Sequence, residues 1–566
     1  MKTTIVKKIK AAMLVLVMGA GFIGGVTKIA GALTVTSIYL EKGPVAGGQE
    51  VTITGDFNQG VEWKQISAGF QHTCAIASND QMYCWGGNST GRLGDGTTTN
   101  SYTPVAVLLG DRPVLTVKQI AAGTNHTCAI ASNDQVYCWG SNANGRLGDG
   151  TTTNSYTPVA VQLGDRPNLT VKQIAVGDRH TCAIASNDRV YCWGYNIWGQ
   201  LGDGTGGPPG TYKSTPVAVQ LGDRPDLTVK QITASDDHTC AIASNNQVYC
   251  WGSNGHGQLG DGTNSDRLTP VAVQLGDRPD LTVKQIVAGS WSTCAIASNN
   301  QAYCWGDNHW GQLGDGTTTD RYTPVAVQLG DRPDLTVKQI TANGGNHTCA
   351  IASNDQVYCW GDNEYGSLGD GTTTGRYTPT APQLGNRPDL TVKQITAGYD
   401  HTCAIASNDQ VYCWGSNANG PLGIGYNTGP ATCTPGVISI ACSKTPVAVL
   451  LPPATYTVTM DPSGTPAPCT DVVVATDGKS LTCTTSAHIA GLVDVTVDNG
   501  VSAKTLVKGY EYVKDGSDGG GGSLIKDILS PDTGAGRVVG LLVLGEVVIV
   551  AMGVAVFFKI KKEEFR

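Results

Sequence analysis

The sequence predicts an all-β protein whose main part is a seven-bladed β-propeller. A unit of nearly constant sequence occurs seven times, and its first cysteine lies at Cys74, Cys128, Cys182, Cys240, Cys294, Cys349 and Cys403. These cysteines are spaced by 54, 54, 58, 54, 55 and 54 residues, and such a period is typical of one supersecondary unit used repeatedly. The unit is rich in glycine, threonine, valine and tyrosine and has no helical stripe, which indicates a small antiparallel sheet, and seven sheets can close into a ring.

Four strands are expected in each unit, and in the second copy they are residues 117–120, 126–131, 135–139 and 157–161. Ser-Asn-Asp or Ser-Asn-Asn between the second and third strands predicts a tight turn, because asparagine and aspartate tolerate the left-handed conformation. Such a turn places the two cysteines of each unit opposite each other. Weak alternation of polar and apolar residues indicates that both faces of each sheet are buried.

The chain has 18 cysteines, and 14 of them form a Cys-x9-Cys pair in each unit. This spacing does not fit zinc sites and predicts nine local disulfides in an oxidising compartment. The predicted pairs are Cys74–Cys84, Cys128–Cys138, Cys182–Cys192, Cys240–Cys250, Cys294–Cys304, Cys349–Cys359, Cys403–Cys413, Cys433–Cys442 and Cys469–Cys483.

The N-terminal residues predict export, and the C-terminal residues predict anchoring. Residues 1–32 predict a signal peptide, with a basic start, an apolar run over 11–26 and a small-residue cleavage site at 30–32; the alternative is an uncleaved anchor. Residues 514–529 predict a flexible linker, and 538–558 predict a membrane-spanning helix followed by a basic tail. The expected location is the cell surface, with the C-terminus anchored in the membrane or the cell wall. A net charge of −8 without a basic patch argues against nucleic-acid binding.

The segments His-Thr-Cys-Ala-Ile, Tyr-Cys-Trp-Gly-x-Asn and Gly-x-Leu-Gly-Asp-Gly resemble the repeats of the regulator of chromosome condensation family. The resemblance runs from Trp63 to about Leu450 and implies a seven-bladed propeller, assigned here to residues 61–452. In that family the eponymous member exchanges nucleotide on a small GTPase and binds chromatin. An exported bacterial relative binds β-lactamases through its propeller face, which is a closer precedent for an exported acidic chain.

Two further resemblances concern the flanks. Residues 33–60 and 453–513 look like the opening and closing strands of an IPT/TIG immunoglobulin-like domain, which implies a β-sandwich with the propeller inserted in an early loop. The alternative is two unrelated half-sandwiches. Within residues 530–566, Ser-Pro-Asp-Thr-Gly before the apolar span resembles a sortase cell-wall sorting signal, although Ser530 stands where that family has leucine. The resemblance implies cleavage between Thr533 and Gly534.

The seven copies differ mainly in two kinds of loop. The loops between strands one and two and between strands three and four are expected at one end of the ring, because strand direction alternates. The predicted partner-binding residues lie in these loops: Phe70, Trp198, His256, Trp291, His309, Trp310, Tyr365 and Tyr399. The alternative is drift in unconstrained loops. The other end holds the nearly invariant turns and both propeller termini, so the varied end is predicted to face away from the cell.

Neither a metal nor another cofactor is predicted, and no catalytic residue. Six histidines precede Thr-Cys, one per unit, and are expected to make a structural hydrogen bond within each blade. Leu-Gly-Asp-Gly-Thr lacks the ligand series of a calcium loop and predicts a glycine turn with an aspartate–backbone bond.

The sequence therefore predicts a non-catalytic, adhesin-like surface protein that binds an extracellular protein or glycan. One alternative is a surface-displayed inhibitor or ligand like the β-lactamase-binding relative. The other is a glycan-acting enzyme, for which the candidate carboxylates are Asp236, Asp307, Asp362 and Glu364.

Overall fold

The structure is a computed structural model that separates the chain into two units, residues 60–453 and residues 1–59 with 454–566. Backbone and side chains are described over residues 62–450, apart from 79, 110–115, 164–168, 209–210, 222–226, 275–281, 330–334, 343, 384–389 and 434–438. Outside this range only the backbone of strands within 34–56, 457–513 and 542–559 is described.

The first unit contains seven sheets, and in six of them neighbouring strands follow the order of the sequence. Blade 1 is β4–β7 (Trp63–Ala68, His72–Ala77, Met82–Gly86, Ser101–Ala106), blade 2 is β8–β11 (Val117–Ala122, His126–Ala131, Val136–Gly140, Ser155–Ala160), and blade 3 is β12–β15 (Val171–Val176, His180–Ala185, Val190–Tyr195, Tyr212–Ala218). Blade 4 is β16–β19 (Val229–Ala234, His238–Ala243, Val248–Gly252, Arg267–Ala272), blade 5 is β20–β23 (Val283–Ala288, Ser292–Ala297, Ala302–Gly306, Arg321–Ala326), and blade 6 is β24–β27 (Val337–Ala342, His347–Ala352, Val357–Gly361, Arg376–Thr380). Blade 7 is β28–β32 (Val392–Ala397, His401–Ala406, Val411–Ser416, Ala431–Cys433, Ile440–Ala448). Blade 7 differs by the short edge strand β31, which pairs with β32.

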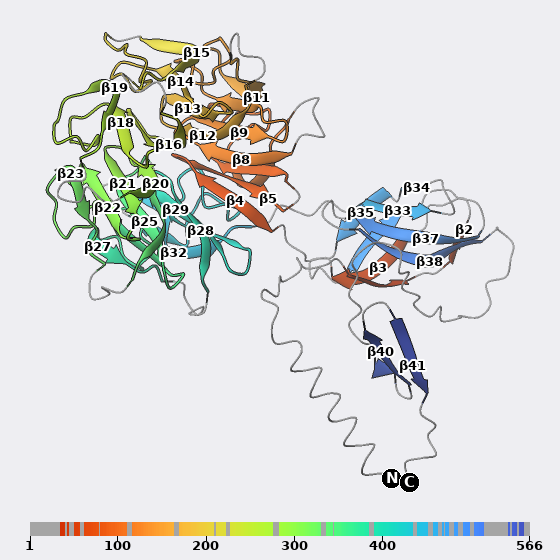
Figure 1. Cartoon of the computed structure of the whole chain (residues 1–566). Helices are drawn as coiled ribbons and strands as arrows, with labels where there is room; N and C mark the ends of the chain where they lie inside the picture. The colour runs from red at the N-terminus through yellow and green to blue at the C-terminus, as the bar shows by residue number, and fades with distance from the viewer. Residues whose placement is uncertain are drawn as a thin grey trace, which may run out of the picture. The chain divides into compact units, whose positions relative to one another are not determined.

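The seven blades close into a ring, as the repeat predicts. The first blade, coloured orange in Figure 1, lies beside the seventh, coloured teal, and β4 contacts β28. At this junction Gln394 Oε1 accepts a hydrogen bond from the Ile66 amide (3.1 Å), and Gln394 Nε2 donates to the Ile66 carbonyl (3.3 Å). The junction of blades 1 and 2 has the same bond, since Gln65 Oε1 accepts from the Ile120 amide (3.1 Å). A glutamine side chain thus joins each pair of neighbouring inner strands.

The hydrophobic core lies between neighbouring blades. The second strand of blade 2, β9, is buried at every position, which explains the weak alternation in the sequence. Trp139 of blade 2 is fully buried and packs with Ile76 and Leu93 of blade 1. The tryptophan of every Cys-Trp-Gly segment is buried in the same way. Each unit therefore depends on its neighbour for a complete core.

The predicted disulfides within the ring are confirmed. Cys128 lies directly opposite Cys138 in the β9–β10 ladder, with 4.1 Å between Cα atoms, and the same pairing recurs in all seven blades. Cys433 and Cys442 form an eighth bridge between β31 and β32. The turn before Val136 has Asp134 at φ 61°, the left-handed conformation that the sequence predicts. The predicted Cys469–Cys483 bridge lies outside the residues whose side chains are described.

The glycine of each Cys-Trp-Gly segment is required by its backbone. Gly140 has φ +102°, and a Cβ there would lie 2.6 Å from the Asn125 carbonyl oxygen. We expect Gly140→Ala to destabilise the propeller by about 3 kcal/mol or more, since both the conformation and the space exclude a side chain. Chemical denaturation monitored by circular dichroism measures the loss.

Gly255→Ala is the matched control, because a Cβ at Gly255 meets nothing within 4 Å and its φ is not positive. The control is expected to unfold within about 0.5 kcal/mol of the parent protein. Equal destabilisation by the two substitutions would contradict the assigned backbone conformation.

The second unit combines strands from both sides of the propeller sequence. One sheet has the order β1 (Thr34–Tyr39), β3 (Glu50–Asp56), β36 (Ser480–Thr484), β35 (Thr470–Val474). The other has the order β2 (Lys42–Pro44), β38 (Ala503–Val513), β37 (Gly491–Asp498), β33 (Thr457–Asp461), β34 (Ala467–Pro468). β3 pairs with β36 antiparallel, and β2 pairs with β38 parallel. These pairings join residues 34–56 to residues 470–513, while the IPT/TIG-like sandwich stays a prediction.

The C-terminal span differs from the prediction. Within 538–558, where a membrane-spanning helix is expected, the structure has the strands β39 (Leu542–Val543), β40 (Glu546–Ala551) and β41 (Val554–Lys559). The runs Val-Val-Ile-Val and Val-Ala-Val-Phe-Phe are β-branched or aromatic and have a high strand propensity. No helix among the described residues has the length and apolarity needed to cross a membrane. The predicted signal peptide, the linker and the residues Thr533 and Gly534 lie outside the described residues.

Candidate functional site

The two kinds of varied loop lie together at one end of the ring. Arg92 Nη1, in the loop between the third and fourth strands of blade 1, donates to the Thr124 carbonyl in the first loop of blade 2 (3.0 Å). Arg146 Nη1 donates in the same way to the Asp178 carbonyl of blade 3 (2.9 Å). We call the end formed by these loops the variable rim, and the opposite end, with the Ser-Asn-Asp turns, the uniform rim.

Five of the predicted partner-binding residues lie on blades 3, 4 and 5 of the variable rim. Trp198, Trp291 and Trp310 are 41%, 43% and 36% exposed, which is unusual for so large an apolar side chain. The His256 ring stacks on Trp291 (centroids 5.6 Å apart, 27° between planes), and His309 meets Trp310 edge to face (5.4 Å). These residues form a partly exposed aromatic surface that spans three consecutive blades.

The other three predicted residues lie on blades 6, 7 and 1. Phe70 meets Tyr399 edge to face across the closure of the ring, with centroids 4.6 Å apart. Tyr399 is 36% exposed, and Phe70 and Tyr365 are half-buried. The structure thus brings the predicted residues together in two aromatic groups on one rim.

Carboxylates on the variable rim lie close enough to raise one another's pKa. Burial, followed by the charge of Asp178, raises the pKa of Asp236 to about 7. Burial raises the pKa of Asp237 to about 6, and burial together with the charge of Asp362 raises that of Asp400 to about 7. The rim therefore offers carboxyl groups that exchange a proton near neutral pH as well as charged ones.

Three of the four carboxylates considered for a glycan-acting enzyme make local hydrogen bonds. Asp236 accepts a hydrogen bond from Ser290, and Asp307 Oδ2 accepts one from Gln312 Nε2 (2.6 Å). Asp362 Oδ1 accepts one from the Glu364 amide (3.0 Å). These bonds give three of the four a role in shaping the rim loops.

The repeated histidines are structural, and their partners correct the sequence prediction. His126 Nε2 bonds to Thr181 Oγ1 of the next blade (2.8 Å), not to a group within its own blade. Thr181 Oγ1 and Trp193 Nε1 both donate to the Arg146 carbonyl (3.0 and 2.9 Å), so the threonine hydroxyl accepts from a neutral imidazole. Five further His–Thr pairs bridge five of the six other junctions, and at the junction of blades 5 and 6 the histidine position is Ser292. Each of these histidines therefore links its own blade to the next one by a hydrogen bond.

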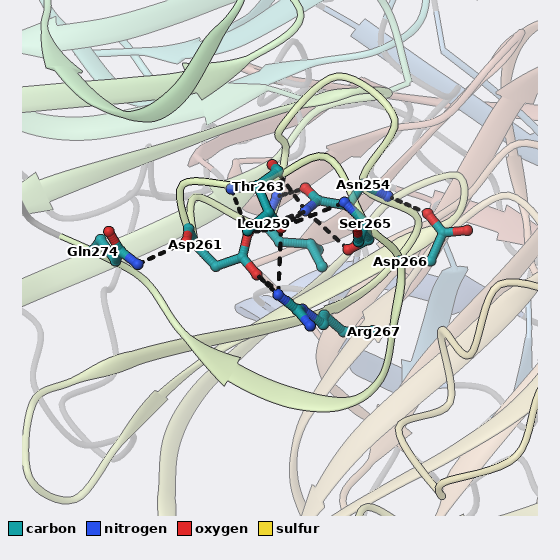
Figure 2. Close-up of polar contacts among 8 residues, drawn as sticks. All are labelled: Asn254, Leu259, Asp261, Thr263, Ser265, Asp266, Arg267 and Gln274. Carbon is teal, nitrogen blue, oxygen red and sulfur yellow. Dashed lines mark hydrogen bonds and ion pairs between the residues drawn. The ribbon is translucent and has the colours of Figure 1, made fainter.

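The Leu-Gly-Asp-Gly-Thr turn is also structural, as the sequence predicts. Figure 2 shows the turn of blade 4, in which Asp261 Oδ1 accepts from the Thr263 amide (3.0 Å) and from Asn254 Nδ2 (3.1 Å). Arg267 Nη2 donates to Asp261 Oδ2 (2.6 Å). Burial alone raises the pKa of the Asp261 carboxyl, but the bonds from Thr263 and Arg267 outweigh it and lower that pKa. Both carboxylate oxygens of Asp261 thus accept hydrogen bonds from protein donors.

A central cavity that was not predicted from the sequence opens at the uniform rim and has a volume of about 1490 Å³. It is lined by the lysines of Val-Lys-Gln-Ile, including Lys172 and Lys230. Lys172 forms an ion pair with Asp188 (2.6 Å). Lys230 and Lys284 instead donate hydrogen bonds to the side-chain oxygens of Asn246 and Asn300. The signal was available, since an exposed lysine recurs at the second position of every first strand. Because these ion pairs are about half exposed, they contribute little to stability.

A second set of exposed aromatic side chains was also missed. Tyr156, Tyr322 and Tyr377 are 44–51% exposed and occupy the second position of a fourth strand, on the outside of the ring. A Cβ on Gly91 would meet the Tyr156 ring at 2.3 Å, so the tyrosine covers that glycine of the preceding blade. The recurring Tyr-Thr-Pro of the sequence carries this signal.

Comparisons with known proteins identify the repeats. Residues 41–279 match the RCC1-like domain, and residues 283–312, 337–367 and 392–420 match the regulator of chromosome condensation (RCC1) repeat. The chain is 32% identical to the ultraviolet-B receptor UVR8 of Arabidopsis thaliana over 364 residues, which are 64% of this chain and 78% of that protein. It is 27% identical to the E3 ubiquitin-protein ligase HERC2 of Homo sapiens over 62% of this chain, but this match spans only 7% of HERC2.

Solved structures share the fold. Prp20p from Saccharomyces cerevisiae aligns with a TM-score of 0.53 and 21% identity, covering 75% of this chain and 93% of that one. Human WBSCR16 aligns with a TM-score of 0.54 and 21% identity, covering 61% of this chain and 88% of that one. At this level of identity the likeness concerns the propeller architecture.

Proposed function

Because the chain belongs to the family of regulator of chromosome condensation (RCC1) repeat proteins, we propose that it is a non-catalytic binding protein whose variable rim holds a protein partner. One observation carries the proposal: Trp198, Trp291, Trp310 and Tyr399 are all at least 36% exposed on one rim of an otherwise nearly constant repeat. Large exposed aromatic residues next to polar groups are typical of the central residues of protein interfaces. Prp20p was described together with its binding properties to Gsp1p and histones, which supports a protein ligand in this fold.

The place of action is proposed as the cell surface. Eight disulfides in the described part of the chain support an oxidising compartment, because reducing cytosol does not maintain such bridges. The basic start and apolar run within residues 1–32 support export. Anchoring by the C-terminus is supported by the apolar composition of residues 538–558 and the basic tail after them, and not by the strands that the structure has there. In this setting the protein acts as an adhesin on a protein of another cell or of the matrix.

The proposal predicts a loss of binding in one triple variant. The full chain is screened against arrays of extracellular proteins and of glycans, and the affinity for each hit is measured by surface plasmon resonance. Changing Trp198, Trp291 and Trp310 to Ala is expected to weaken binding at least about 100-fold, because buried aromatic anchors contribute most of the energy of an interface.

The control carries Lys64→Ala and Lys338→Ala on the uniform rim, where both side chains are about half exposed. This variant is expected to bind like the parent protein. Full binding by the tryptophan variant, or an equal loss in the lysine variant, would refute the variable rim as the partner site. A protein hit supports the proposed ligand class, and a glycan hit alone replaces it.

A further inference from the structure

Three metal-binding side chains meet on the variable rim at the junction of blades 4 and 5. His256 comes from the loop after β18, and Asp307 and Asp320 come from the loop after β22. One donor atom of each side chain lies within 4.8 Å of the donor atoms of the other two. When histidine, cysteine, aspartate and glutamate side chains are considered together, no other group of three among the described residues has this geometry.

The separations fit a small cation. His256 Nδ1 lies 3.1 Å from Asp320 Oδ2 and 3.7 Å from Asp307 Oδ1. Ligands of a tetrahedral zinc ion lie about 2.0–2.2 Å from the metal, so their mutual distances are about 3.4 Å. The two observed distances fall on either side of this value.

The protein already orients each carboxylate. Asp320 Oδ1 accepts from the Asn308 amide (2.9 Å), which leaves Oδ2 toward His256. Asp307 Oδ2 accepts from Gln312 Nε2 (2.6 Å), whereas Asp307 Oδ1 accepts from the His309 amide (3.3 Å) and lies toward His256. Outer donors that fix the unused oxygen of a carboxylate are a regular feature of metal centres. The stacking of His256 on Trp291 fixes the imidazole plane as well.

The charge at this junction favours a cation. Asp307 is only 5% exposed, so a carboxylate there needs a partner for its charge. Two carboxylates that ligate one ion bring two negative charges, which a divalent ion neutralises. His256 is 45% exposed in its side chain, so solvent reaches the remaining coordination positions.

The other junctions act as an internal comparison. The residues at the position of His256 in the other blades are Thr90, Asn144, Trp198, Trp310, Tyr365 and Asn419. In blade 5, Asp320 accepts a hydrogen bond from the backbone amide of Asn308. The equivalent backbone amides of blades 1, 2 and 4 donate to Asn100, Asn154 and Asp266. Ser253 of blade 4 occupies the position of Asp307. An aspartate also occurs singly at these positions in other blades, as Asp266 in blade 4 and Asp362 in blade 6, but blade 5 carries both aspartates and only this junction adds a histidine.

We propose that His256, Asp307 and Asp320 form a binding site for a divalent transition-metal ion of the zinc class, with at least one position open to solvent or to a partner. One imidazole nitrogen with two carboxylate oxygens suits zinc, whereas calcium takes six to eight oxygen ligands. The site does not depend on the proposed partner binding, although it lies among the same aromatic residues.

The test measures binding of Zn²⁺ to the full chain after treatment with a chelator. Isothermal titration is expected to give one ion per chain, and added Zn²⁺ is expected to raise the melting temperature. Cobalt absorption spectra report the number of ligands, and Co²⁺ is expected to quench the fluorescence of Trp291 beside His256.

The variants use residues that the repeat itself carries at the same positions, so each is compatible with the fold: His256→Asn, Asp307→Ser and Asp320→Asn. Each is expected to weaken Zn²⁺ binding at least about 100-fold, because it removes one of three protein ligands. The matched controls Asp266→Asn and His309→Asn are expected to bind like the parent protein. The proposal is overturned if binding is not saturable at one ion, if His256→Asn binds as tightly as the parent, or if Ca²⁺ binds as tightly as Zn²⁺. In the first of these cases the three side chains form only an ion pair.

Discussion

The propeller is expected to lose stability steeply as the pH falls below about 6.5. Burial lowers the pKa of His180, His238 and His401 to about 3 and that of His347 to about 4, and burial also holds the pKa of His72 and His126 well below the usual value. In the unfolded chain these six residues bind protons near pH 6.5. The unfolded state therefore takes up protons that the folded state refuses, and the stability present above pH 6.5 is lost toward pH 4.

The aspartates of the variable rim act in the opposite direction. The pKa values of Asp236, Asp237 and Asp400 are raised to about 7, 6 and 7, so the folded state binds these three protons first. Their contribution to stability grows as the pH falls from 7 toward 4. At pH 5 the difference is three protons, or about 4 kcal/mol for each pH unit. For a propeller of about 390 residues this corresponds to a decrease in melting temperature of about 5 °C per pH unit.

Thermal melts between pH 7.5 and 4.5 measure this slope, and two variants separate its parts. His238→Ser copies the fifth blade, which carries Ser292 at this position, and is expected to reduce the slope by about 1.4 kcal/mol per pH unit. Asp400→Asn removes an opposing group and is expected to steepen the slope by about as much. A melting temperature that stays level or rises between pH 6.5 and 4.5 would contradict the neutral buried histidines.

The second large effect concerns the disulfides. Each of the seven blade bridges closes a loop with a sequence separation of 10, which stabilises the folded state by at most about 3 kcal/mol in the chain-entropy description. Eight such bridges together contribute up to about 24 kcal/mol, and this upper limit is larger than the total stability of about 5–15 kcal/mol that is usual for a folded protein. We expect the fully reduced chain to remain unfolded at 25 °C after dilution from guanidinium, whereas the oxidised chain refolds. Circular dichroism and thiol counting by mass spectrometry measure this outcome.

The folded protein should nevertheless resist reductant, because both cysteines of every bridge in the described residues are fully buried. The double variant Cys433→Ser, Cys442→Ser is a control, since this bridge ties only the edge strand β31 and lies outside the repeated pairs. It is expected to refold under oxidising conditions as the parent does. Refolding of the reduced parent chain would show that the blades do not depend on their bridges.

Features that arise within one unit could be predicted from the sequence. The pairing of Cys128 with Cys138 follows from a tight turn and the period of a strand, and the number of blades follows from the number of copies. The two kinds of varied loop lie at one rim because strands alternate in direction. These inferences need only local geometry.

Features that arise between units could not be predicted in the same way. His126 finds its partner in Thr181, because neighbouring blades are offset so that one blade's second strand faces the next. His256 and Asp320 are 64 residues apart and come from different blades. No local motif contains them together, and only the angle between two blades brings their donor atoms within reach.

The bonds that close the ring have a consequence for how this protein can vary. Gln394 binds Ile66 as Gln65 binds Ile120, and His401 binds Thr73 as His126 binds Thr181. Each of the seven blades is made of strands from one continuous stretch of sequence, so the propeller sequence can begin with any of the seven copies. The glutamine bond is the same at every junction, and the histidine bond is the same at all but the one where blade 5 carries Ser292. Recombination between near-identical copies therefore exchanges rim residues while the bonds that join neighbouring blades are kept.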